Sequence, residues 1–245
     1  MYFYDMNGNE LSKDRFIDYF SSCYFEKDED VKRIRCSNEI VENAIENILK
    51  NGFQTKEDVI AVLAWKTGKL SHTSKMISAK SPFHYHKNWF NEDDFSVRFY
   101  GKTAVCLTGF ADKVLNLQGS FYDQSSQTIL QNLCSSAPDG IGTVYLITFL
   151  FFLSHGEYPI YDRFADIALQ AILENKQPSG NIQYSALPTK KDKDFDSICS
   201  EKGRYGKYIR DFITVFGENY KNNRKIDQAL WVYGHQFQNK KQQAC

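Results

Sequence analysis

Residues 138–172 decide the fold, and they read PDGIGTVYLITFLFFLSHGEYPIYDRFADIALQAI. Gly140 and Gly142 flank Ile141, and two glycines at this spacing predict a tight turn with accessible backbone N–H groups. The apolar run at 143–153 then predicts a buried helix, because it has no polar face to turn toward water.

A second helix is predicted soon after this run. Pro159 favours an extended backbone, so we expect the chain to approach Asp162 in an extended conformation. Apolar residues then recur at helical spacing, at Phe164, Ile167, Ala168, Ala171 and Ile172. One carboxylate is therefore expected at the start of a new helix, shortly after a glycine turn.

This order of elements resembles the helix-hairpin-helix DNA glycosylases, in particular their 8-oxoguanine glycosylase branch. The matching residues are GIGT at Gly140–Thr143, the apolar helix, and PIYD ending at Asp162. Two shorter segments, AWKTGK at Ala64–Lys69 and DQALWVYGH at Asp227–His235, look like parts of bacterial proteins with the same fold.

The resemblance implies an all-α, two-lobed helical bundle that contains a helix-hairpin-helix motif, like the DNA glycosylases. Residues 1–245 would form a single domain, with lobes at 1–135 and 136–245 and the hairpin and Asp162 within 138–172. In this family the hairpin binds DNA phosphate through backbone amides, and Ile141 would insert into the core. The residues implied for DNA binding are Gly140, Ile141, Gly142 and Thr143.

Asp162 is the predicted catalytic residue. By resemblance it assists cleavage of the N-glycosidic bond. A carboxylate suits this chemistry, because it stabilises the positive charge that develops on the sugar or orients the attacking water. The alternative is structural, since Asp is a preferred N-cap just before an amphipathic helix. The two roles are compatible.

Val144 indicates which nucleophile the reaction uses. In bifunctional members of the family, a lysine at the corresponding helix position forms a Schiff base with the sugar, and valine cannot do so. We therefore expect water to attack and an intact abasic site to remain. Lys66 is the one lysine embedded in apolar sequence and is a candidate substitute, although such a lysine more often extends to the surface.

The base pocket is assigned to aromatic residues, because an extruded base needs a stacking surface and hydrogen bonds to its edge. Trp231 and His235 are four residues apart on the last predicted helix and share a face, and by resemblance this helix lines the pocket. Tyr161 and Trp65 are assigned to the same pocket. The alternative is a packed tryptophan with a hydrogen-bonded histidine.

The composition is that of an ordinary soluble globular protein with an aromatic bias, at 42% hydrophobic and 15% aromatic residues. The apolar run at 143–153 is too short to span a bilayer, and the opening MYFYD is unlike a secretory leader. We expect a cytoplasmic monomer with no membrane contact.

The cysteine and histidine patterns argue against a metal or a cofactor. None of the six cysteines forms a Cys-x-x-Cys pair, so an iron–sulfur cluster or a zinc ribbon is not expected. His84 and His86 have metal-like spacing, but no acidic or thiol partner lies near them in sequence, and a surface loop is the better interpretation.

The net charge of +0 counts against a DNA-binding surface, since such proteins usually carry a basic excess. The charge is uneven, however, because the triplets 28–30 and 92–94 make the first half locally acidic. The basic residues of the last third are Lys190, Lys191, Lys193, Lys202, Arg204, Lys207, Arg210, Lys221, Arg224 and Lys225. A basic face in this third is compatible with a neutral total.

The rest of the chain also reads as helical. Apolar periodicity predicts helices at 15–24, 39–49, 125–133, 205–216 and 222–237. A capping box at Thr55 and Asp58 opens another helix, which Gly68 closes. Strand character competes at 95–107, where we favour helix, and residues 71–94 read as a long connection. The polar stretch from Gly180 to 196 is expected to be loosely ordered.

Three functions from different classes remain open at this point. The first is a monofunctional DNA glycosylase that acts on double-stranded DNA containing an oxidised guanine-type or hypermodified base, in repair or in defence against foreign DNA. The second is a non-catalytic DNA-binding protein that retains the helix-hairpin-helix fold, and this would need a strong basic face. The third is an interaction domain in which the glycine turn and Asp162 coincide by chance.

Overall fold

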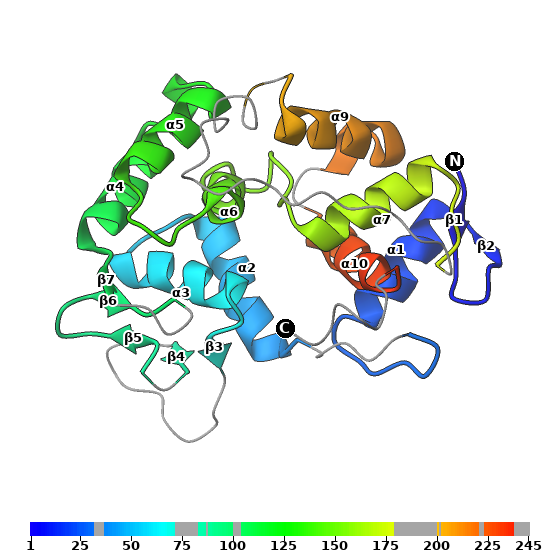
Figure 1. The fold of residues 1–245 in the computed structure, drawn as a ribbon, viewed down its shortest axis with the longest axis horizontal. Coiled ribbons are helices and arrows are strands. Elements are labelled where there is room, and N and C mark those ends of the chain that lie inside the picture. The colour runs from blue at the N-terminus through cyan, green and yellow to red at the C-terminus, as the bar shows by residue number, and fades with distance from the viewer. Residues whose placement is uncertain are drawn as a thin grey trace. The chain divides into compact units, whose positions relative to one another are not determined.

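The computed structural model describes residues 1–31, 37–71, 83–86, 88–99, 104–178, 200, 202–220 and 223–237. Within these residues the chain forms nine α-helices, two short 3-10 helices and seven two-residue strands (Figure 1). The prediction of a helical fold is confirmed at this level, with short strands in addition.

Contacts divide the chain into two compact units. The first unit contains Met1–Ser37 and the described residues from Gly156 onward, and the second contains residues 38–155. These boundaries differ from the lobes predicted at 1–135 and 136–245. The difference arises because the first helix packs against the last one, a contact that no local periodicity encodes.

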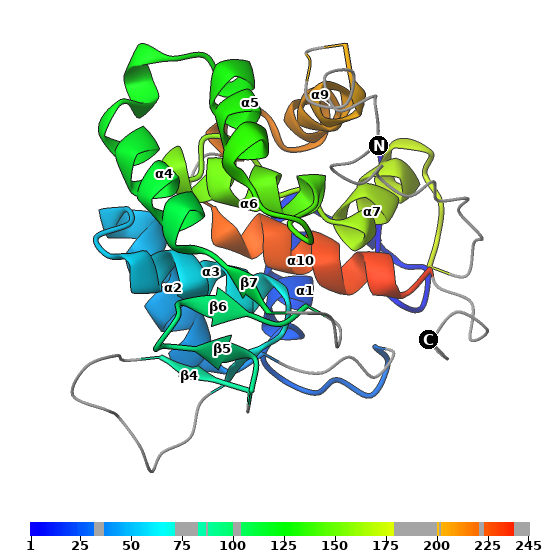
Figure 2. The same cartoon turned by 60° about the vertical axis from the view of Figure 1, so that its left-hand side comes forward.

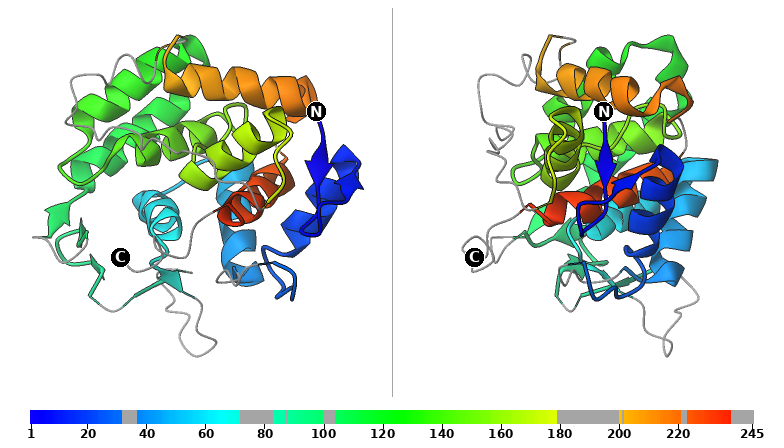
Figure 3. Two further views of the ribbon diagram at one scale, coloured as in Figure 1. Left: turned by 45° about the vertical axis from the view of Figure 1, so that its right-hand side comes forward. Right: turned by 90° about the vertical axis from the view of Figure 1, so that its right-hand side faces the viewer.

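The first unit is built around its last helix. α10 (Arg224–His235) packs against both α1 (Lys13–Ser22) and α7 (Arg163–Leu173), and α9 (Arg204–Phe216) packs against α7 (Figure 3). The smaller elements of this unit are β1 (Phe3–Tyr4), β2 (Glu10–Leu11) and the 3-10 helix η2 (Glu218–Tyr220).

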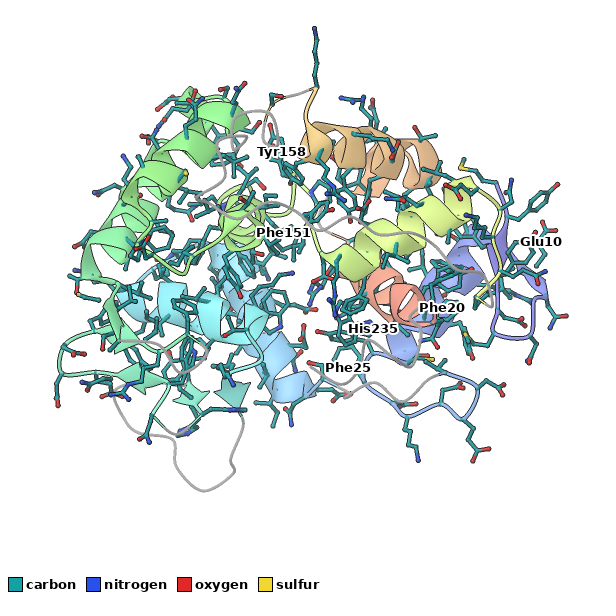
Figure 4. All side chains as sticks on the ribbon, viewed as in Figure 1. Glu10, Phe20, Phe25, Phe151, Tyr158 and His235 are labelled. Atoms are coloured by element: carbon teal, nitrogen blue, oxygen red, sulfur yellow. The ribbon has the colours of Figure 1, made fainter. Side chains whose placement is uncertain are left out.

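Aromatic rings fill the contact between α1 and α10. The ring centroid of Tyr233 lies 5.0 Å from that of Phe16 and 4.9 Å from that of Phe20. Phe20 is labelled in Figure 4. All three rings are buried, and ring pairs at such separations add attraction to the free energy of burial. This contact joins the two ends of the chain.

The second unit is built around α6 (Thr143–Leu153). This helix contacts α2 (Glu39–Asn51), α3 (Lys56–Lys66), α4 (Thr108–Gly119) and α5 (Ser126–Ser136). Nine of its eleven residues are buried, which confirms the buried helix predicted from the apolar run. A short 3-10 helix, η1 (Phe121–Asp123), connects α4 to α5.

The predicted caps of the early helices are confirmed. The Thr55 hydroxyl accepts a hydrogen bond from the backbone N–H of Asp58, whose carboxylate accepts from the backbone N–H of Thr55 in return. α2 ends at Asn51 and is followed by Gly52, with a φ of 73°, and α3 is followed by Gly68, with a φ of 65°. Glycine adopts this left-handed conformation without the steric cost that other residues bear.

The described residues of this range, 95–99 and 104–107, do not form the helix predicted at 95–107. β6 (Ser96–Val97) pairs antiparallel with β5 (Phe90–Asn91) and with β7 (Val105–Cys106), which gives a three-stranded sheet (Figure 2). The helical spacing that suggested a helix belongs to α4, which begins only at Thr108. The alternating apolar pattern before it was the correct signal.

Strand pairing also occurs in the stretch predicted as a connection. β3 (Leu70–Ser71) pairs antiparallel with β4 (His84–Tyr85), so part of 71–94 is ordered by backbone hydrogen bonds. The polar stretch at 181–196 lies outside the described residues.

Candidate functional site

Asp162 occupies the N-cap position of α7. Its backbone is extended, with φ −142° and ψ 148°, and its Oδ1 accepts a hydrogen bond of 2.8 Å from the backbone N–H of Phe164. The structural alternative raised by the sequence is therefore present. It does not exclude a chemical role, because the carboxylate is only half-buried and keeps some contact with solvent.

Three aromatic side chains adjoin this N-terminus, and we call Phe164, Trp231 and His235 the aromatic stack. The His235 ring lies parallel to the Phe164 ring, with centroids 3.4 Å apart and planes 20° apart. The Trp231 ring is 4.1 Å from His235 by the same measure. The predicted pairing of Trp231 with His235 on one helix face is confirmed, and Phe164 joins them from α7.

Two further residues extend the aromatic stack. The guanidinium carbon of Arg163 lies 4.4 Å from the centroid of the Phe164 ring, within the range of a cation–π contact. Tyr24, from the segment after α1, meets Trp231 edge-on at 5.4 Å. The segment after α1, the start of α7 and the end of α10 therefore meet at the aromatic stack.

The hydrogen bonds of His235 fix its tautomer. Its Nδ1 lies 2.7 Å from the carbonyl oxygen of Trp231. A carbonyl oxygen can only accept, so Nδ1 carries the proton, and in the neutral ring Nε2 is then an acceptor. Burial, together with a smaller effect of the positive charge of Arg163, lowers the pKa of His235 to about 4. The ring is therefore neutral at physiological pH.

Asp162 and His235 are electrostatically coupled. The carboxylate of Asp162 raises the pKa of His235 and so opposes the effect of burial. Phe164 links the two residues, because its backbone N–H donates to Asp162 and its ring stacks on that of His235. The structure thus brings the predicted catalytic residue and two predicted base-pocket residues, Trp231 and His235, into one neighbourhood of the first unit.

Gly234 sets the spacing between α7 and α10. A Cβ atom at this position would lie 1.9 Å from the carbonyl oxygen of Phe164, so the two backbones touch where any larger residue would separate them. Asp162 lies two residues before Phe164 in the sequence, and His235 directly follows Gly234. The close approach therefore holds the aromatic stack against the N-terminus of α7.

The predicted phosphate-binding turn lies in the second unit. Gly140 has a φ of 102°, which favours glycine, and Ile141 is 0% exposed, as expected for a residue that inserts into the core. Gly142 is the N-cap of α6 and provides no side-chain hydrogen bond. The first N–H groups of a helix lack intrahelical partners, so this N-terminus has the chemistry of an anion site.

Thr143 follows this turn with an unusual hydroxyl group. Its side chain is 1% exposed, and within the described residues its Oγ1 is a buried polar atom without a hydrogen-bond partner. A buried hydroxyl of this kind is costly, so the N-terminus of α6 is not fully satisfied by the protein's own groups.

The remaining predicted residues have structural contacts. Tyr161 is 0% exposed, and its hydroxyl donates to the Asp166 carboxylate at 2.7 Å. Trp65 donates from its indole nitrogen to Glu42 at 2.8 Å, and Lys66 is the last residue of α3. Tyr161 belongs to the first unit with Asp162, whereas Trp65 and Lys66 belong to the second unit.

Four residues of this neighbourhood were not singled out from the sequence: Tyr24, Arg163, Phe164 and Gly234. Gly234 carried a usable signal, since a glycine inside a helical pattern often marks a close approach of two backbones. Phe164 fits the apolar face of α7, and this spacing alone does not indicate a further contact. Tyr24 is brought in by the tertiary fold and had no local signal.

Many described basic residues of the last third are paired within the first unit. Arg204 lies 3.6 Å from Asp166 and Lys225 lies 3.5 Å from Asp18. Ion pairs also join Lys207 to Asp211 and Arg224 to Asp227. Each of these four cations therefore has a carboxylate partner within the same unit. The predicted residues Lys190, Lys191, Lys193 and Lys221 lie outside the described residues.

A cavity of about 670 Å³ lies in the second unit. Its lining comes from the end of α2, the start of α3 and Phe83, and it includes none of the predicted site residues. In the described part of the chain, no group of three or more His, Cys, Asp or Glu side chains is placed to hold a metal ion. Among the same residues, no helix is both long enough and apolar enough to cross a membrane.

Comparison of the chain with protein-family models, with curated proteins and with solved structures finds no match.

Proposed function

We propose that this protein is a DNA glycosylase that hydrolyses the N-glycosidic bond of a modified or damaged base. The observation that carries the proposal is the place of Asp162, a half-buried carboxylate beside the aromatic stack of Phe164, Trp231 and His235. The order of glycine turn, buried helix and Asp162 along the chain supports it in addition.

The chemistry of these groups suits the reaction. Departure of the base leaves positive charge on the sugar, which a fixed carboxylate stabilises without reorganisation. Aromatic rings supply a surface for an extruded base. The neutral His235 offers Nε2 as an acceptor for an N–H group on the base edge.

Water is the proposed nucleophile. Val144, in the first turn of α6, cannot form a Schiff base, so the product is an intact abasic site. Borohydride therefore traps no protein–DNA adduct in this scheme. A trapped adduct that is lost in the Lys66→Ala variant would replace water by Lys66 as the nucleophile.

The proposed substrates are bases of the oxidised-guanine type or hypermodified bases. Incubation of the protein with oxidised genomic DNA and with phage DNA that contains hypermodified bases, followed by mass spectrometry of the released free bases, identifies the base. Release of no base from either DNA contradicts the proposal.

The decisive variant is Asp162→Asn. Asn can still cap α7, so the substitution removes the charge and spares the structural role. We expect base release to slow by about 100-fold or more, as for the loss of one transition-state-stabilising group. The thermal midpoint and the DNA affinity should remain close to those of the wild type.

A matched control is Asp58→Asn, which makes the same change at the first turn of α3 in the second unit. This variant should release the base at the wild-type rate. Full activity of Asp162→Asn would remove Asp162 from the mechanism, and an equal loss in both variants would indicate a general effect of the substitution.

A second candidate is a non-catalytic DNA-binding protein. It is favoured by the direct contact between His235 and Phe164, whose ring centroids are 3.4 Å apart and leave no space for a base between them. In that case the wild type binds DNA with an affinity that falls steeply with salt, but releases no base. Affinity that does not change with salt would contradict both candidates.

A further inference from the structure

The segment that leads into Asp162 is held by tyrosine hydroxyl groups from later in the chain. Tyr205 on α9 donates to the carbonyl oxygen of Pro159 at 2.7 Å, and Tyr208, one turn further, donates to that of Ile160 at 3.2 Å. Figure 1 shows α9 beside α7 in the same unit. We call Tyr205 and Tyr208 the tyrosine clamp.

This segment depends on such donors. Residues 159–161 belong to no helix or strand, and Pro159 has no N–H group of its own. Pro159 and Ile160 are both buried, and the hydrogen bonds to their carbonyl oxygens are buried as well, so water does not supply the donors. The tyrosine clamp therefore supplies the donors that a sheet would otherwise provide.

The donors are reliable because the clamp is buried. Both tyrosine side chains are 2% exposed. Burial raises the pKa of Tyr208 well above 10, and the nearby Asp166 raises it further, so the hydroxyl keeps its proton.

α9 also holds the chain on the other side of Asp162. Asp166, in the first turn of α7, lies 3.6 Å from Arg204 at the start of α9 and accepts from the Tyr161 hydroxyl at 2.7 Å. The Tyr161 ring in turn packs edge-on against Tyr208, with centroids 5.0 Å apart. Asp162 thus lies between two points that α9 fixes.

We propose that Tyr205 and Tyr208 are positioning residues that set the place of the Asp162 carboxylate beside the aromatic stack. The inference rests on the proposed function for its effect on catalysis, although not for its effect on geometry. A small displacement of a catalytic group is costly, since a shift of about 1 Å can lower a rate about 100-fold.

The test uses the full chain with Tyr205→Phe, Tyr208→Phe and the double variant. The matched control is Tyr233→Phe, which removes a hydroxyl from another buried tyrosine of the same unit, where it faces the carbonyl oxygen of Lys176. Three quantities are measured at a temperature where every variant is folded. They are the single-turnover rate of base release, the DNA affinity, and the rate of hydrogen exchange at the Phe164 and Asp166 amides.

We expect the double variant to release the base about 10- to 100-fold more slowly, with DNA affinity within about twofold of the wild type. The Phe164 amide, which donates to Asp162, should exchange at least about tenfold faster, because its cap is no longer held in place. Tyr233→Phe should change none of the three quantities.

The outcomes separate the positioning role of the tyrosine clamp from the proposed function. Unchanged exchange at Phe164 and Asp166 in the double variant overturns the positioning role, whatever the activity. Faster exchange with an unchanged rate of base release also overturns it, because the carboxylate then works without the clamp. If the wild type releases no base, the proposed function fails, and faster exchange still supports the clamp as the element that holds Asp162.

Discussion

The N-termini of α6 and α7 are capped in opposite ways. α6 begins after Gly142, which has no side chain to accept from the first N–H groups. α7 begins after Asp162, whose carboxylate accepts from the N–H of Phe164 at 2.8 Å. The two N-cap residues are twenty positions apart, and one is uncharged while the other carries a carboxylate.

The difference indicates what each end can do. The positive end of a helix dipole attracts an anion, and at α6 that anion must come from outside, which suits a phosphate group. At α7 the protein supplies the anion itself. Asp162 therefore stabilises its helix whether or not it has a chemical role, and only a substitution that keeps the cap can separate the two.

The largest expected effect is a loss of stability where the N-terminal end of α7 contacts α10. In Gly234→Ala the new Cβ would lie 1.9 Å from the Phe164 carbonyl oxygen, which is backbone and cannot rotate away. α7 and α10 must separate, and we expect the free energy of unfolding to fall by about 3 kcal/mol or more. Chemical denaturation measures the loss.

The control for this variant is Gly109→Ala in α4, where an added Cβ meets nothing within 4 Å. Alanine is a better helix former, so this variant should be slightly more stable than the wild type. A Gly234→Ala variant as stable as the wild type would mean that α7 and α10 do not touch at Phe164.

The next effect concerns the pH dependence of stability. The pKa of His235 falls from 6.5 to about 4 on folding because its ring is buried. The unfolded chain then binds a proton more readily, so stability is complete above pH 6.5 and declines as the pH falls toward 4. We expect the wild type to lose about 3 kcal/mol more than His235→Phe between pH 8 and pH 4.

The same histidine reports on Asp162. The carboxylate raises the pKa of His235 against the effect of burial, so Asp162→Asn should lower that pKa further. An NMR titration of the His235 ring measures the shift. A pKa that is the same in both proteins would place Asp162 too far from His235 for the proposed site.

The smallest expected effect comes from giving α6 an acidic N-cap residue, as α7 already has in Asp162. Gly142 has a φ of −87°, and an added Cβ would meet nothing within 4 Å, so Gly142→Asp fits the turn. We expect the free energy of unfolding to rise by a few tenths of a kcal/mol. DNA affinity should fall about fivefold, because the new carboxylate takes the place of a phosphate.

Gly142→Asn is the matched control, because it can cap the helix without a charge. It should bind DNA more tightly than Gly142→Asp in a titration at low salt. Equal affinities for both variants and the wild type would exclude the N-terminus of α6 from DNA binding.

Much of the local structure followed from the sequence. The bounds of α6 matched the apolar run, because an element that is apolar all round must be buried. The capping box at Thr55 and the N-cap at Asp162 were also readable, since both depend on residues within four positions of each other. The sequence misled at 95–107, where the spacing of the next helix overlapped a strand pattern. It also gave no sign of the pairing of β3 with β4 in the stretch expected to be a connection.

The tertiary structure decided what lies next to Asp162. The aromatic stack joins Phe164 to Trp231 and His235 across a long stretch of sequence, and its spacing depends on one glycine that lets two backbones touch. The tyrosine clamp reaches back more than forty residues to carbonyl oxygens that carry no side-chain signal. Local patterns therefore determined where Asp162 stands in its helix. Its surroundings depended on contacts between distant segments, which no window of the sequence contains.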